Sequence, residues 1–216
     1  MRLIVFFFTS LYFFSSFAID LNPYVYDAKP GYIIDPAHTL FLPSFSYQQT
    51  TSDSCGPAVV MTLLNYYGVL PSGQMNTQTE RKISSEMHTN LFGTDQMDMV
   101  DWLKRNKFTV EWGYAIHTQD IISSLQKHQP VIIVMIDWSG HAVLVIGYQD
   151  NPHNSDQSLF FLANPSSQNY VIYKNKPIFG IDTVSKKEIE DMWVNAKYFF
   201  NPLKIQVGMY IIAKPG

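Results

Sequence analysis

Cysteine is almost absent from this sequence. Cys55 is the single cysteine among 216 residues, so it has no partner for an intramolecular disulfide. A cysteine-rich zinc site is excluded for the same reason, and the six histidines form no His-Glu-x-x-His motif. A glycine-rich phosphate-binding loop is also lacking. We therefore expect chemistry that needs neither a metal nor another cofactor.

Charge is scarce too, and it is balanced. Charged residues make up 15% of the sequence, and 15 Lys and Arg against 18 Asp and Glu give a formal net charge of −3. The basic residues are scattered rather than gathered in a stripe, so the sequence does not indicate nucleic-acid binding. Hydrophobic residues make up 46%, which is enough for one compact core in a chain of single-domain length.

The first eighteen residues have the pattern of a secretory signal peptide. A positive start at residues 1–2 precedes an apolar run at 3–14, and residues 16–18 are suited to cleavage. The run is shorter than the about 20 apolar residues of a membrane-spanning helix. We therefore expect residues 1–18 to be removed on export from a bacterial cell, to the periplasm or beyond, leaving a domain at 19–216 with no membrane segment.

The first part of this domain is predicted to be irregular and then helical. Residues 19–47 are rich in Pro, Tyr and Asp and predict an irregular wrap with one short strand at 39–42. Residues 56–68 have Pro near the start, Gly at the end and apolar residues on nearly all sides, which predicts a central buried helix. Weaker helical patterns occur at 79–88, from 95 onwards with Met97, Val100 and Leu103 inward, and at 119–127 behind a Thr118 cap.

Strand patterns dominate the second part. Apolar, largely β-branched runs predict strands at 131–136, 142–148, 159–163, 170–173 and 207–213. Ser185 and Glu188 match a capping box for a helix at 185–193 that interrupts these strands. Helices that precede a sheet indicate an α+β fold, in which N-terminal helices pack on a C-terminal antiparallel sheet.

Cys55 stands where a reactive thiolate is favoured. The thiolate is the nucleophilic form of cysteine, and the free N–H groups and positive dipole at a helix start stabilise it. Cys55 directly precedes the helix predicted at 56–68, and its neighbours Asp53, Ser54 and Gly56 are not large apolar residues. An inert buried thiol is the alternative interpretation, but these neighbours favour a nucleophile.

His141 is the candidate base for this nucleophile. The pKa of histidine suits proton transfer near neutrality. Gly140 precedes His141 and the predicted buried strand at 142–148 follows it, and a rigid strand holds a catalytic group accurately. The other histidines lie in polar segments typical of the surface. A core histidine bonded to a backbone carbonyl is the alternative for His141.

A triad also needs a residue that orients the base, and donors for the oxyanion. Asn164 follows the predicted strand at 159–163 and precedes Pro165, so it is the candidate for the orienting residue, with a simple Asn-Pro turn as the alternative. The backbone N–H of Cys55 and the side-chain amide of Gln49 are the candidate oxyanion donors.

The nucleophile segment resembles that of a known family. Gln49 to Ala58, followed by Leu64 to Gly68, is similar to the bacteriocin-processing, double-glycine leader type of papain-like cysteine peptidase, particularly its stand-alone relatives. Further segments resemble the sheet, the catalytic histidine and acidic residue, and the last helix of that family: 130–133, 140–148, 163–165 and 185–193. The resemblance keeps the order of the family from Gln48 to Ala213.

This resemblance implies a papain-like cysteine proteinase fold and a set of site residues. It implies a Cys-His-Asp/Asn triad at Cys55, His141 and Asn164, with Gln49 in the oxyanion hole. We expect a peptide or protein as the substrate, although the resemblance does not specify which one.

The chain departs from the pattern of the family at three places. Ser54 stands directly before the nucleophile where Asp is common, and Asn164 stands where Asp usually precedes the proline. Residues 149–158 look like an insertion that lengthens the interval between the histidine and the third member of the triad. Alternatives to Asn164 therefore stay open: Asp137, Asp150 and Asn151.

The leading hypothesis is a cysteine peptidase or amidohydrolase that forms a thioester acyl-enzyme with a peptide or isopeptide substrate. One alternative is acyl transfer of the phytochelatin-synthase type, because those enzymes share the Gln-x5-Cys-Gly arrangement. Another is a non-catalytic papain-like binding protein whose contact surface includes Tyr24, Tyr26 and Tyr32.

Overall fold

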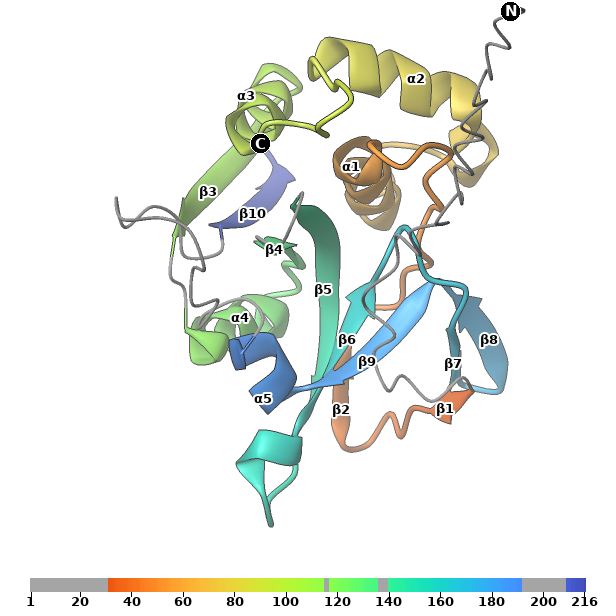
Figure 1. The fold of residues 1–216 in the computed structure, drawn as a ribbon. Helices are drawn as coiled ribbons and strands as arrows, with labels where there is room; N and C mark the ends of the chain where they lie inside the picture. The colour runs from red at the N-terminus through yellow and green to blue at the C-terminus, as the bar shows by residue number, and fades with distance from the viewer. Residues whose placement is uncertain (1–30, 115–116, 136–139, 192–208) are drawn as a thin grey trace, which may run out of the picture.

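The computed structural model describes residues 31–114, 117–135, 140–191 and 209–216 (Figure 1). Several predictions fall outside these ranges: the signal peptide at 1–18, the first part of the wrap at 19–47, the end of the helix at 185–193, and residues Tyr24, Tyr26 and Asp137. Within the described ranges, the structure has the predicted combination of helices and an antiparallel sheet.

The main sheet has seven strands. Six follow one another in the order β3, β10, β4, β5, β6, β9, and all their pairings are antiparallel. Their bounds are Phe108–Tyr114, Met209–Pro215, Val131–Met135, His141–Gln149, Leu159–Ala163 and Ile181–Ser185. The seventh, β2 (Thr39–Phe41), pairs with residues 147–149 of β5, beyond the end of β4. The long strand β5 thus pairs with three strands, β2, β4 and β6.

A small second sheet stands beside the main one (Figure 1). It contains β1 (Tyr32–Ile33), β7 (Tyr170–Tyr173) and β8 (Lys176–Phe179) in the order β1, β7, β8. The strand predicted at 170–173 is therefore present, but it belongs to this sheet and not to the main one. Lys174 and Asn175 join β7 to β8 with φ angles of 48° and 62°, the left-handed pair that a tight two-residue hairpin requires.

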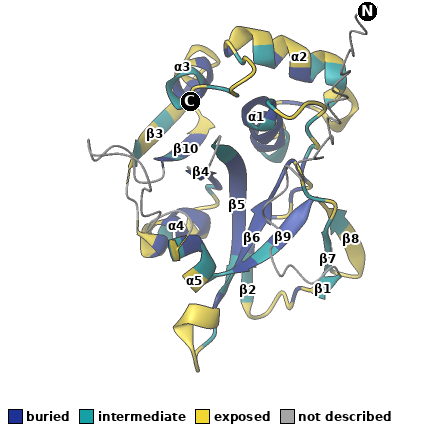
Figure 2. Ribbon diagram, viewed as in Figure 1, coloured by how far each residue is buried: buried dark blue, intermediate teal, exposed yellow. Residues whose placement is uncertain are grey.

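Helices cover both sides of the main sheet (Figure 1). On one side lie α1 (Cys55–Tyr66), α2 (Thr77–Glu86) and α3 (Gln96–Arg105); on the other lie α4 (Thr118–Gln126) and α5 (Lys186–Ile189). Residues 131–135 of β4 and 142–147 of β5 are all buried, because both faces of these strands are covered (Figure 2). Helix α1 is buried from Gly56 to Leu64, as its nearly uniform apolarity predicts.

Most predicted helices and strands are present within two residues of their predicted bounds. Four strands of the described residues had no prediction: β1, β3, β8 and β9. Strand β1 has only two residues. Strand β3 is an exposed edge strand, β8 contains Pro177, and β9 contains Asp182 and Thr183 in place of a continuous apolar run. In α3 the predicted Val100 and Leu103 are buried, together with Met99 and Trp102, whereas the predicted Met97 is only half-buried. Among the described residues no helix is long and apolar enough to cross a membrane.

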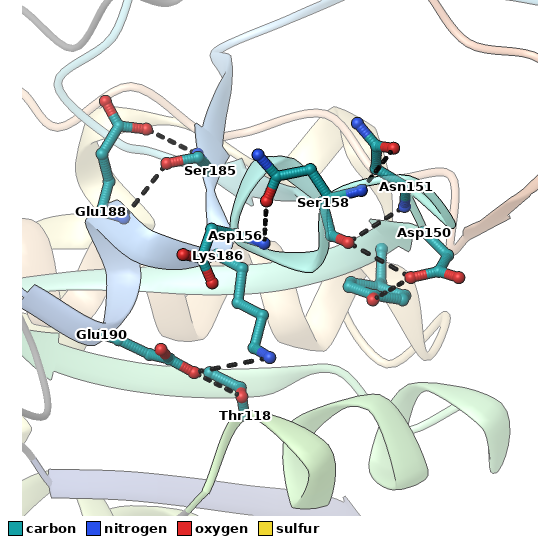
Figure 3. Close-up of polar contacts among 11 residues, drawn as sticks. Thr118, Asp150, Asn151, Asp156, Ser158, Ser185, Lys186, Glu188 and Glu190 are labelled. Carbon is teal, nitrogen blue, oxygen red and sulfur yellow. Dashed lines mark hydrogen bonds and ion pairs between the residues drawn. The ribbon is translucent and has the colours of Figure 1, made fainter.

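The cap predicted for α4 is wrong by one residue. His117 is the N-cap, and its N–H donates to the Asp120 carboxylate at 3.2 Å. Thr118 is the first helical residue, and its Oγ1 donates to Oε1 of Glu190 at 3.0 Å (Figure 3). This hydrogen bond joins the start of α4 to the residue that follows α5.

The capping box predicted at Ser185 is present. Ser185 Oγ accepts from the N–H of Glu188 at 3.1 Å, and the Glu188 carboxylate accepts from the N–H of Ser185 at 2.6 Å (Figure 3). The N–H of Lys186 donates to the carbonyl of Ser158 at 2.7 Å. The loop between β5 and β6, predicted as an insertion at 149–158, therefore packs against α5, away from the start of β5.

The pairing of β2 with β5 depends on Gly147. A Cβ at this position would lie 2.9 Å from the carbonyl oxygen of Leu40 and 2.9 Å from Phe41 Cδ2. We therefore expect Gly147→Ala to lower the free energy of unfolding by about 1–3 kcal/mol through overpacking. Urea denaturation measures this change. Gly73→Ala is the matched control because a Cβ there meets no atom within 4 Å, and equal midpoints for the two variants would contradict the prediction.

Candidate active site

The thiol of Cys55 lies at the first residue of helix α1. Ser54 is the N-cap residue of this helix, and Cys55 is half-buried. The N–H groups of the first turn have no partner within the helix and are available to an anion at this end. Gly56 permits close packing here, because a Cβ at this position would lie 2.8 Å from Thr94 Oγ1. The start of α1 thus packs closely against Thr94, in the segment before α3.

Packing of α1 on β5 brings Cys55 to His141. His141 is the first residue of β5, and the preceding Gly140 has φ 72°, a conformation that favours glycine. Burial of the sulfur raises its pKa. The hydrogen bond with His141, the charge of that imidazole, and the N–H groups of Ala142 and Gly56 outweigh burial, so the pKa of Cys55 is lowered overall.

Asn164 lies on the other side of the imidazole. Its Oδ1 is 2.9 Å from His141 Nε2, and Asn164 itself is buried. Because an amide oxygen accepts, His141 Nε2 carries the proton and Nδ1 is left to face Cys55. Two of the alternatives to Asn164, Asp150 and Asn151, instead contact Ser158. Ser158 Oγ donates to Asp150 Oδ1 and accepts from the N–H of Asn151. Asn164, and not these two residues, lies against His141.

The buried carboxylate of Asp182 contacts the side chain of Asn164. Asn164 Nδ2 donates to Asp182 Oδ2 at 2.6 Å, and Asp182 is 2% exposed. The Asn164 N–H is also fixed, since it donates to the carbonyl of Gly180 at 2.9 Å. Sequence reasoning missed Asp182. The local sequence gives no clear sign of this burial, since β9 also contains Thr183 and Ser185 and the donors to the carboxylate come from residues 164–169.

Gln49 lies beside the turn that follows Asn164. The N–H of Gln49 donates to the carbonyl of Pro165 at 2.9 Å, and Gln48 Nε2 donates to the carbonyl of Asn164 at 3.2 Å. One side-chain N–H of Gln49 is directed at the carbonyl of Thr51, at 2.7 Å. Its Oε1 is buried without a hydrogen-bond partner in the described part of the chain. The structure thus brings the Gln49 backbone to the site, and one of its two side-chain N–H bonds has no acceptor among the described residues.

A second buried carboxylate, that of Glu80, accepts hydrogen bonds from the loop before Cys55. Glu80 projects from the first turn of α2 and is 1% exposed. Its Oε1 accepts from the N–H of Thr50 at 2.9 Å and from Ser54 Oγ at 2.7 Å. Its Oε2 accepts from Thr50 Oγ1 at 2.6 Å and from Tyr47 OH at 3.2 Å. Ser54, which replaces the Asp common in the family, is therefore bonded to a carboxylate supplied by another helix.

The remaining histidines lie elsewhere. His38 contacts Asp35 at 2.6 Å and His88 contacts Asp98 at 3.2 Å, both at the surface. In the ranges that the structure describes, no cluster of three or more His, Cys, Asp or Glu side chains is arranged to hold a metal ion. The polar groups gathered around Cys55 are suited to nucleophilic chemistry by thiolate and imidazole.

Comparisons with known proteins give a family and a fold for this chain. The model of the Peptidase_C39 like family matches residues 44–199. The peptidase domain of Streptococcus ComA, a bi-functional ABC transporter, is 17% identical with a TM-score of 0.54, over 80% of this chain and 98% of that chain. A double glycine motif protease from an AMS/PCAT transporter, in complex with the leader peptide, is 13% identical with a TM-score of 0.52, over 82% and 94%. A putative C39-like peptidase from Bacillus anthracis is 12% identical with a TM-score of 0.53, over 81% and 99%. No curated protein matches the sequence significantly. These likenesses confirm the predicted papain-like fold.

The hydrogen bonds that Glu80 accepts lead to a prediction about stability. In Glu80→Ala the buried hydroxyl of Ser54 and the N–H of Thr50 lose their acceptor, so we expect the free energy of unfolding to fall by about 2 kcal/mol or more. Urea denaturation followed by circular dichroism measures it. Gln78→Ala, at an exposed position of the same helix, is the control and is expected to change stability by about 0.5 kcal/mol or less. A Glu80→Ala midpoint equal to that of the control would refute a supporting role.

Proposed function

The chain belongs to the Peptidase_C39 like family and is a cysteine peptidase, and from this premise we propose that Cys55 is its nucleophile, His141 its base and Asn164 the residue that orients the base. The observation that supports this proposal best is the hydrogen-bonded pair of Cys55 and His141 at the start of α1, where several contacts lower the pKa of the thiol. A thiolate paired with an imidazolium is the reactive form of such a site.

The proposed reaction begins with attack of the Cys55 sulfur on the carbonyl carbon of a peptide or isopeptide bond. The carbonyl oxygen becomes an oxyanion, which the N–H of Cys55 and the side-chain amide of Gln49 stabilise. His141 then gives its Nδ1 proton to the leaving amine, and the carbon–nitrogen bond breaks to leave a thioester. Water, deprotonated by His141, attacks the thioester and releases the acid.

Asn164 keeps the imidazole in the orientation that this reaction needs. With Nε2–H directed at Asn164 Oδ1, the imidazole presents Nδ1 to the sulfur. The contact is neutral when His141 is neutral and becomes a charge-assisted hydrogen bond when His141 carries two protons. Asn164 therefore stabilises the imidazolium partner of the thiolate.

A peptide is the proposed substrate, processed by hydrolysis. The double glycine motif protease that shares the fold was solved in complex with the leader peptide, which supports a peptide ligand in the equivalent place. A peptide-aldehyde probe that captures Cys55 in a cell extract, with competition by candidate peptides, tests the substrate class. Acyl transfer predicts that added γ-glutamyl thiols divert the acyl-enzyme, whereas hydrolysis predicts that water remains the acceptor.

The first prediction from this proposal concerns the reactivity of Cys55. Because its pKa is lowered, the thiolate persists below the ordinary pKa of cysteine, and reactivity falls only as the pH drops through the lowered value. We expect rapid alkylation by iodoacetamide at pH 6. In His141→Ala the hydrogen bond and the charge of the imidazole, two of the contributions that lower the pKa, are lost while burial remains, so labelling at pH 6 should be roughly tenfold slower or more.

Mass spectrometry of the labelled protein over time measures both rates. His38→Ala, which removes an exposed histidine paired with Asp35, is the matched control and should label like the wild type. If Cys55 reacted no faster than a free thiol at pH 6, the thiolate–imidazolium pair and the proposed triad would be wrong.

A second prediction concerns Gln49. Gln49→Ala removes an oxyanion donor, so kcat for a cleaved peptide should fall by about 10²–10³-fold. Alkylation of Cys55 at pH 6 forms no oxyanion and should change little. Steady-state kinetics together with the labelling rate separate the two effects. A variant that loses both to the same extent would indicate that Gln49 supports the loop instead of the oxyanion.

A further inference from the structure

We propose that Asp182 is a positioning residue that fixes the side-chain amide of Asn164, so that an Asn–Asp pair replaces the single acidic residue usual in this family. This inference rests on the proposed triad. Asp182 is the second residue of β9, paired with Leu162 of β6, while Asn164 follows the end of β6. Asp182 makes no contact with substrate in this proposal and acts through Asn164.

The contacts around Asn164 allow one orientation of its amide. Oδ1 accepts from His141 Nε2 at 2.9 Å, from the N–H of Ser166 at 3.0 Å and from Ser166 Oγ at 3.0 Å. Nδ2 donates to Asp182 Oδ2 at 2.6 Å. A flipped amide would place Oδ1 against the carboxylate and Nδ2 against the N–H of Ser166, so that two repulsive contacts would replace two hydrogen bonds. The Asp182 carboxylate thereby directs Oδ1 toward His141.

Asp182 is itself held in place by donors. Its Oδ1 accepts from Ser167 Oγ at 2.5 Å and from Asn169 Nδ2 at 2.8 Å. No salt-bridge partner of Asp182 is found in the described part of the chain. A buried carboxylate is tolerated when hydrogen bonds satisfy it. Its negative charge polarises the amide of Asn164 and strengthens the acceptor that faces the imidazole.

The pair also accounts for asparagine at position 164. With Asp at this position, two carboxylates would face each other at about the 2.6 Å now spanned by the amide and Asp182. Such a pair retains a shared proton, because the first charge raises the pKa of the second group. Asn164→Asp should therefore be tolerated at low pH and lose stability as the pH rises through that raised pKa. Exchanging the two residues, with Asp at 164 and Asn at 182, restores one carboxylate and one amide and removes the repulsion between two carboxylates.

The test compares the wild type, Asp182→Asn, Asn164→Asp and the exchange Asn164→Asp/Asp182→Asn. Alkylation of Cys55 by iodoacetamide at pH 6 should be roughly tenfold slower in Asp182→Asn, because contacting residues couple by about this much. The melting temperature of Asn164→Asp should fall between pH 5 and pH 8 relative to the wild type. In the exchanged variant the melting temperature should follow the wild type, and the labelling rate should recover to within about threefold of it.

Controls keep the two proposals apart. Asp150→Asn, at a carboxylate bonded to Ser158 and Tyr148, should label and melt like the wild type. If Asp182→Asn labelled at the wild-type rate, or if the exchange relieved nothing, the role of Asp182 would be wrong while the triad stood. If the wild type itself were unreactive at pH 6, the triad would be wrong.

A measurement on the unmodified protein covers the case in which a variant does not fold. The side-chain amide protons of Asn164 should exchange with solvent far more slowly than those of exposed asparagines, and one should be shifted downfield by the carboxylate. Nuclear magnetic resonance of the 15N-labelled protein detects both effects. Rapid exchange of the Asn164 amide would overturn the inference, whatever the variants show.

Discussion

The arrangement of this protein depends on one contact, between the sulfur of Cys55 and the imidazole of His141. The two residues belong to different layers, since one opens helix α1 and the other opens strand β5 (Figure 1). A hydrogen bond tolerates only a few tenths of an ångström in distance. The packing of α1 on β5 must therefore be fixed to that tolerance, and this accounts for a helix that is buried on nearly every side.

Burial at this contact works against the chemistry unless other groups offset it. Removing the Cys55 sulfur from water raises its pKa, while the imidazole and two backbone N–H groups lower it further than burial raises it. The helix start supplies part of this without any charged side chain. A nucleophile at a helix start can thus remain partly desolvated and still ionise, which is the combination that an amide-cleaving thiol needs.

Periodicity and end signals in the sequence were sufficient for the framework of the fold. The apolar residues of α1, the apolar runs of β4, β5 and β6, and the Ser185 capping box each specify their element locally. Strand β9 escaped prediction because Asp182 interrupts its apolar run. Strand β7 has a clear strand pattern, but no local signal says which sheet it joins.

The residues of the candidate site were likewise predicted only in part. Cys55, His141 and Asn164 follow from their places beside predicted elements and from the family resemblance. The two supporting carboxylates do not, because their partners are distant along the chain: Glu80 bonds to Ser54, and Asp182 bonds to Asn164. An acidic residue in a sequence gives no sign of being buried until the donors around it are known.

These two carboxylates support the site from opposite sides. Glu80 fixes the loop that ends at the nucleophile, and Asp182 fixes the amide that faces the base. Each is satisfied by hydroxyl and amide donors within the described residues, so neither loses free energy to an unpaired charge. Both positions at which the chain departs from the usual acidic residue, Ser54 and Asn164, bond to one of these carboxylates. At both positions the negative charge lies one residue outward from the site, and a neutral side chain transmits its orienting effect through a hydrogen bond.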